Sequence, residues 1–237
     1  MADTLIEKFN TAESYYEKAV ALLNEISQTV VEVAPDYDTE GAIAQYDAIL
    51  QAVLLATAIK DNTLEENEVR FISQITSTGD ILLALNSTIA SAGLDYEKIE
   101  WSDLRALVES SDDDKKHRIV RFICSLAYKI SGDFIKYYAP VDELNQRDFK
   151  NELTDLTLPI IMAFCEVDGE SMESDFNPED ETETNVEAEL GTGVSLFRAM
   201  LVDRWEEAIA EFTRSNPETQ GDDAPSDAPS DTEDDGE

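Results

Sequence analysis

Apolar residues recur along most of this chain with the spacing of α-helices. Within residues 3–34 the spacings alternate between four and three, the heptad pattern of a helix that packs along one seam. The seam comprises Leu5, Phe9, Ala12, Tyr16, Ala19, Leu23, Ile26, Val30 and Val33. One long helix ending at Pro35 is predicted. It can pack on the rest of the chain or on a second copy, and small residues at two seam positions favour the first.

The next part of the chain predicts a central helix followed by shorter ones. Residues 41–60 are apolar over most of the helix circumference, which is typical of a helix buried on all sides. A capping box that begins at Thr63 predicts the start of a third helix. Further helices are expected at 80–91, at 102–108 with Ser102 as the cap, and at 114–130.

Prolines divide the second half of the chain. Pro140 is expected to preclude a continuous helix, and helical character returns over 142–167, with Pro159 as a kink or a fresh first turn. A last helix is expected from residue 185 or 195 to residue 212. No stretch alternates apolar and polar residues for long enough to form a sheet. The predicted fold class is therefore all-α, a compact multi-helix bundle.

The net charge of the chain indicates which kinds of partner it can bind. Its 237 residues include 53 acidic and 17 basic side chains, a net charge of −36, far more than solubility requires. Nucleic-acid binding is not expected, because the largest basic cluster, within 115–121, directly follows three aspartates. Cations or basic protein surfaces are the expected partners.

The acids concentrate in two segments. Residues 166–189 carry eleven carboxylates and no lysine or arginine, and the low-complexity residues from 215 onward carry nine acids and no base. The second segment cannot bury enough apolar surface to offset its ordering entropy, so a disordered acidic tail is expected. Three regions are predicted: a long N-terminal helix over 1–35, a helical domain over 36–214 and the tail over 215–237.

The cysteines and the N-terminus bear on the location of the protein. Cys124 and Cys165 lie far apart and lack the spacing of a disulfide framework or a zinc site. The first residues lack the features of a signal peptide, and no apolar run approaches the ~20 residues that span a bilayer. A reducing, cytoplasmic location without membrane insertion is expected.

Two acidic turns end apolar helices and are the candidate sites. Asp61 closes the helix over 41–60, and Glu65 and Glu68 share a face of the next helix. Clustered carboxylate oxygens of this kind are the ligands that Ca²⁺, Mg²⁺ or Mn²⁺ prefer. Alternatively, these acids only stabilise the dipole at a helix N-terminus.

A second turn, Asp168-Gly169-Glu170, ends the helix that Pro159 interrupts and opens the acidic run. It aligns with the first: each has Asp at the first place, a turn-forming residue at the second and an acid at the eighth. The aligned segments are residues 61–68 and 168–175.

This repeated pattern resembles the TerB-like family of tellurite-resistance proteins and the related co-chaperone N-terminal domains. Their signature is an apolar helix that ends in Ala-x-x-Asp-Gly. An apolar residue comes next, then Ser or Thr, and then a Glu that opens the following helix. Ala58-Ile59-Lys60-Asp61 with Leu64 and Glu68 matches the first copy, and residues 164–169 match the opening of the second.

Over residues 43–190 the resemblance implies two pseudo-repeated helix-turn-helix units whose acidic turns approach each other and bind a divalent cation. Asn62 departs from the first glycine, Glu65 replaces the hydroxyl residue, and the positions after Gly169 are displaced into the acidic run. The candidate metal ligands are Asp61, Glu65, Glu68, Asp168, Glu170 and Glu173, of which Asp61, Glu68 and Asp168 match the motif best.

The sequence contains few residues in the arrangements typical of catalytic groups. His117 is the only histidine and lies in a charged helix start, and no Ser or Cys has a base at motif spacing. The expected function is therefore a non-enzymatic, TerB-like module acting as a scaffold or sensor in a stress response. Three alternatives remain. The first is an acidic interaction protein that masks a basic partner or mimics nucleic acid, and the second is an enzyme using metal-bound water, which would need an open coordination position and a pocket. The third is adaptation to high salt, against which the concentration of the acids in one loop and one tail argues.

Overall fold

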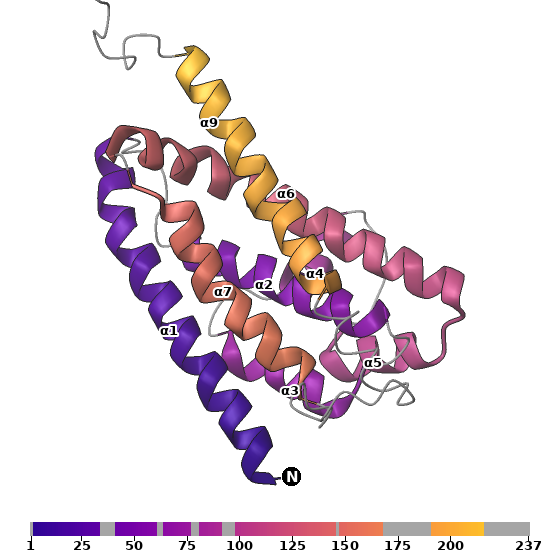
Figure 1. The fold of residues 1–237 in the computed structure, drawn as a ribbon. Helices are drawn as coiled ribbons and strands as arrows, with labels where there is room; N and C mark the ends of the chain where they lie inside the picture. Colours follow the sequence, from indigo (N-terminus) through magenta and orange to yellow (C-terminus); the bar gives the residue numbers. More distant parts are fainter. Residues whose placement is uncertain are drawn as a thin grey trace, which may run out of the picture.

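The computed structural model describes residues 2–33, 41–60, 64–76, 81–91, 98–145, 147–167 and 191–215, and every element within these ranges is helical (Figure 1). The predicted all-α bundle is confirmed. In chain order the elements are α1 (Ala2–Val33), α2 (Gly41–Lys60), α3 (Glu66–Ile75), α4 (Ile81–Ser91), α5 (Trp101–Glu109), α6 (Asp113–Asn145), α7 (Phe149–Cys165), the π-helical η1 (Arg198–Val202) and α9 (Asp203–Ser215). Residues 191–197 are also helical and lead directly into η1.

α1 and α7 lie side by side and antiparallel along one flank of the bundle (Figure 1). Lys8, near the start of α1, forms an ion pair with Glu166, just after the end of α7. Further along α1, Glu25 pairs with Arg147, just before the start of α7, at 2.7 Å. The predicted seam is buried in the core of its own chain at Ala12, Tyr16, Ala19, Leu23, Ile26 and Val30.

α2 is the central helix, as its all-round apolar pattern predicts. Every residue over 46–59 is buried. Its buried polar groups have partners: the Tyr16 hydroxyl donates to the Asp47 carboxylate at 2.7 Å, and Gln51 bonds to the Thr76 hydroxyl and the Ile81 amide, each at 2.6 Å. Within the described ranges α2 alone is long and apolar enough to cross a bilayer, and 83% of that window is buried in the bundle.

Two helix starts differ from the prediction. The N-cap of α3 is Glu65, whose side chain and that of Glu68 form a reciprocal capping box, and Thr63 lies outside the described residues. α5 begins after Glu100, which forms the same box with Asp103, so Ser102 lies inside the helix. In both cases carboxylates take the role that was assigned to a hydroxyl, because they accept the same orphan amide hydrogens.

The expected break at Pro140 is wrong, because α6 continues through it to Asn145. Proline in a helix costs about 3 kcal/mol or more. Here residues 138–141 are all buried in the core, and this burial offsets the loss of one hydrogen bond near the end of the helix. The next helix therefore begins later than predicted, at Phe149, and Pro159 lies inside it.

α9 packs across α6, and its C-terminal end projects past the rest of the bundle in Figure 1. Trp205, fully buried, anchors it: its ring lies 5.3 Å from that of Phe149 and 6.1 Å from that of Phe134, between centroids. Its indole Nε1 donates to the Asp142 carboxylate at 2.9 Å. Helices from both ends of the chain thus share one hydrophobic core.

Candidate functional site

The first acidic turn lies at the start of α3. Glu68 is only 3% exposed, and its carboxylate accepts the Glu65 amide at 2.6 Å. The Glu65 carboxylate accepts the Glu68 amide in return. The structure thus brings these two candidate ligands together, and it engages Glu68 as a buried cap at the positive end of the helix dipole.

The second acidic turn follows the end of α7. Cys165 and Val167 are buried there, and the largely buried side chain of Glu166 pairs with Lys8 of α1. The ion pair neutralises the first acid of the 166–189 run. The ion pair therefore holds the last described residues of this part of the chain, 166–167, beside the N-terminal part of α1.

Aromatic contacts join the helices that flank the two acidic turns. Phe71, in α3, and Phe164, in the last turn of α7, have ring centroids 5.4 Å apart, and Phe9 of α1 lies 5.1 Å from Phe71. Figure 1 shows the C-terminal end of α7 beside α3. We name this region, which carries Glu65, Glu66, Glu68 and Glu166, the acidic end.

The described chain resumes at residue 191 with a helical segment that packs on α2 and α7. A Cβ atom on Gly193 would meet Ile161 of α7 at 2.7 Å and the Thr57 hydroxyl of α2 at 3.1 Å. Thr57 lies in the last turn of α2, and Ile161 lies four residues before the end of α7. The described residues on either side of 168–190 therefore lie beside the helices that bear the two turns.

The remaining candidate ligands, Asp61, Asp168, Glu170 and Glu173, lie outside the described residues, as do Thr63 and most of the acidic run. Within the described ranges, no group of three or more His, Cys, Asp or Glu side chains is arranged to hold a metal ion. The described residues next to them are the end of α2, since Asp61 follows Lys60 directly, and Val167, which Asp168 follows.

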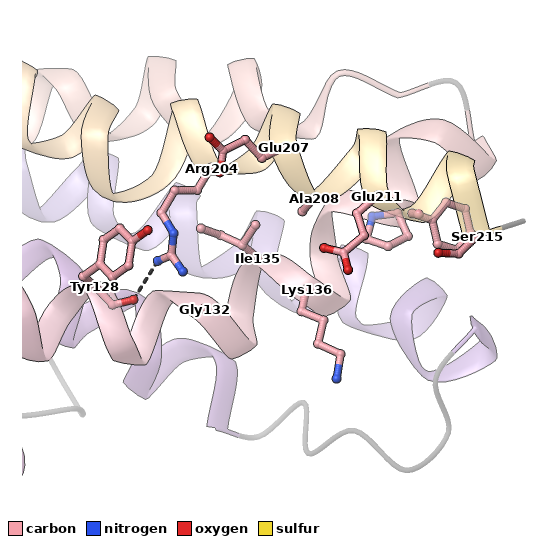
Figure 2. A pocket seen from close by; sticks show the side chains of 11 residues that line it. Tyr128, Gly132, Ile135, Lys136, Arg204, Glu207, Ala208, Glu211 and Ser215 are labelled. Carbon is pink, nitrogen blue, oxygen red and sulfur yellow. Dashed lines mark hydrogen bonds between the residues drawn. The ribbon is translucent and has the colours of Figure 1, made fainter.

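A groove of about 500 Å³ lies between α6 and α9 (Figure 2). Arg204 crosses it: its guanidinium donates to the Tyr128 carbonyl at 2.6 Å and to the Ser131 hydroxyl, and lies 3.7 Å from the centre of the Tyr128 ring. Lys136, Glu207 and Glu211 also line the groove, so its walls carry both signs of charge. We interpret Arg204 as a structural link between the two helices.

Asp142 is a charged residue that the sequence did not single out. Its carboxylate accepts the Phe149 amide at 2.9 Å, the Lys150 amide at 3.4 Å and the Trp205 indole, and so joins α6, α7 and α9. Burial raises the pKa of this carboxyl above its usual range, although the three donors act in the opposite direction.

Arg147 is a second residue that the sequence did not single out. It binds Glu152 through two hydrogen bonds of 2.9 and 2.8 Å, and these bonds lower the pKa of Glu152. The position of Asp142 after Pro140 was the one sequence signal at this junction, and it was interpreted as the start of a helix. For Arg147 the sequence offered no signal, because its partner Glu25 is distant in the chain.

Comparisons with protein-family models, with characterised proteins and with solved structures give no match for this chain. The resemblance to the TerB-like family therefore stays a prediction that rests on the two turns.

Proposed function

We propose that this chain is a non-enzymatic, TerB-like helical module whose acidic end binds a divalent cation, and that it acts as a scaffold or sensor in a stress response. One observation carries the proposal: helices distant in sequence, α3 and α7, meet at this end with Phe71 and Phe164 5.4 Å apart. Asp61 directly follows the last residue of α2, and Asp168 follows Val167, two residues beyond the end of α7. That arrangement supports a shared site.

The chemistry of the described carboxylates limits which of them serve as ligands. Glu68 is buried and already accepts a backbone amide, and Glu166 is paired with Lys8. Glu65 also accepts a backbone amide, but its side chain is exposed and therefore accessible to a cation. We therefore assign the site to Asp61 and Asp168, supported by Glu65 and by Glu170 or Glu173, because hard cations take several oxygen ligands.

Calorimetric titration of Ca²⁺, Mg²⁺ and Mn²⁺ tests this proposal. Saturable binding is expected for the wild type and a loss of at least about 10-fold in affinity for Asp61→Ala/Asp168→Ala, since two ligands are removed from one ion. The matched control is Glu17→Ala/Glu32→Ala, which removes the same charge from exposed positions on α1. Equal heats for the wild type and the Asp61/Asp168 variant would reject a shared cation site.

A second function is favoured by the exposure of the acids at this end. Glu65 and Glu66 are both exposed, with 91% of the Glu66 side chain in contact with solvent. Such a surface suits a basic protein partner. Binding of polylysine, used as a probe, would then weaken steeply with salt and persist in Asp61→Ala/Asp168→Ala. Loss of polylysine binding in that variant would argue against this alternative.

A further inference from the structure

A second groove lies along the N-terminal part of α6, where this helix faces α4 and α5. Its volume is about 550 Å³, within the ~300–1,000 Å³ range typical of small-molecule sites. Its walls are almost wholly apolar, and the side chains that form them include Leu85, Leu104, Leu107, Ile119, Phe122 and Ile123. Phe122 is 40% exposed, so this apolar surface is open to solvent.

Two basic side chains, Lys115 and Arg118, line this groove beside its apolar residues. They lie three residues apart on α6, so their side chains share a face. The Arg118 Nε atom donates to the Asp114 carbonyl at 3.2 Å, which orients the guanidinium. Asp113 and Asp114 precede the pair in the first turn of α6, but neither lines the groove.

These cations have no acidic partner in the part of the chain that the structure describes, where neither Lys115 nor Arg118 forms an ion pair. The chain carries 53 acidic side chains against 17 basic ones. Acids that could pair with the two cations are therefore abundant. A pair of cations beside an exposed apolar groove is the complement of a ligand that has an apolar body and an anionic head.

We propose that this groove binds a single-chain anionic amphiphile, with its hydrocarbon tail along the apolar wall and its carboxylate between Lys115 and Arg118. The guanidinium matches a carboxylate through two parallel hydrogen bonds, and the ammonium adds a second charge. The tail contributes most of the affinity, because each buried methylene is worth roughly a fourfold change in binding at ~0.8 kcal/mol. Phe122 and Ile119 cover the tail.

The charge of the whole chain favours this ligand over an acidic peptide helix. A protein of net charge −36 repels a partner in proportion to the number of carboxylates that the partner carries. An amphiphile needs only one. The wall of the groove that faces α6 is formed by the short helices α4 and α5, which a hydrocarbon tail can follow, whereas a helical peptide needs a longer apolar track for anchors spaced over two turns.

The test is titration of octanoate, decanoate and dodecanoate below their micelle concentrations, followed by calorimetry. We expect one saturable site, with affinity rising on the order of 10-fold from decanoate to dodecanoate. In Lys115→Gln/Arg118→Gln the affinity should fall at least about 10-fold, since a charge-assisted pair is lost. Both side chains are exposed, so the variant should keep the thermal stability of the wild type.

The matched control is Arg121→Gln/Lys129→Gln, which removes the same charge from exposed positions of α6 that do not line the groove. Its affinity for dodecanoate should equal that of the wild type. The proposal is overturned if dodecanoate shows no saturable binding, or if both double variants bind it equally well. It is also overturned if a Glu-rich amphipathic peptide fills the groove while dodecanoate does not compete.

Discussion

At the scale of single residues, the Asp142 carboxylate joins three helices, α6, α7 and α9. Its two oxygens accept three donors, from the backbone of Phe149 and Lys150 and from the Trp205 ring. An asparagine has one oxygen and would turn an amino group toward one of these donors. The position therefore requires a carboxylate, although Asp142 is not one of the candidate ligands.

Asp142→Asn should lower the free energy of unfolding by about 1–3 kcal/mol, because a buried donor loses its acceptor. Urea denaturation of the variant and of Asp155→Asn, an exposed aspartate on α7, provides the measurement. The Asp155 variant should unfold like the wild type. An unchanged midpoint for Asp142→Asn would show that the three hydrogen bonds are not needed.

The raised pKa of Asp142 also predicts a pH dependence. Between the ordinary aspartate value of 3.8 and the raised value, the folded state binds more protons than the unfolded state at this group, so its contribution to stability falls as the pH rises. Glu152 has the opposite sign, because Arg147 lowers its pKa. The Asp142 component should be absent from the pH profile of Asp142→Asn.

At the scale of elements, the helical segment over 191–197 packs closely on the bundle at a glycine, Gly193. Gly193 lets this helix touch both α2 and α7, at Thr57 and Ile161. Gly191, two residues earlier in the same helix, has nothing within 4 Å of its would-be Cβ. Gly193 is therefore required by the close packing of this helix, whereas an alanine at Gly191 would fit and would only increase the helix propensity.

Gly193→Ala should destabilise the protein by about 1–3 kcal/mol through overpacking against Ile161, whereas Gly191→Ala should be neutral or stabilising by up to ~1 kcal/mol. Thermal unfolding of both variants is the measurement. Equal effects would mean that this helix does not pack tightly on α2 and α7.

The elements also show which features local pattern can predict. The periodicity of residues 3–34 and 41–60 was sufficient for α1 and α2, because a long seam or an all-round apolar surface has one consistent solution. It was insufficient at Pro140, where the burial of Tyr138 and Ala139 outweighs the local cost of proline. The start of α3 was misplaced because Glu65 and Glu68 cap each other.

The candidate site was only partly predictable for a similar reason. The sequence identified both acidic turns, but the contacts that bring α3 and α7 to one end, Phe9, Phe71 and Phe164, are distant along the chain. Likewise, Lys115 and Arg118 were seen as a basic cluster, whereas the apolar groove beside them depends on the packing of α4 and α5.

At the scale of the whole molecule, the net charge affects the stability of the fold. A net charge of −36 on one chain opposes the compact state through self-repulsion. The described ion pairs, such as Lys150 with Glu206 and Arg105 with Glu109, engage only a fraction of the acids. Screening should therefore stabilise the fold.

The midpoint of thermal unfolding should rise as NaCl increases from about 0.05 M to about 1 M, where the Debye length shortens from more than 10 Å to about 3 Å. NaCl and KCl should act equally, because screening depends on ionic strength. A midpoint that does not change with salt would indicate that repulsion among the acids is not limiting. Stabilisation by a bound divalent cation would differ, since it saturates with concentration.

The anchoring of α9 has a practical consequence. The chain has two tryptophans, and Trp205 is fully buried between two phenylalanine rings while Trp101 is partly exposed. Release of α9 would transfer the Trp205 indole from an apolar, hydrogen-bonded setting to water. In the variant Trp101→Phe, the fluorescence of Trp205 therefore reports whether α9 is packed against the bundle.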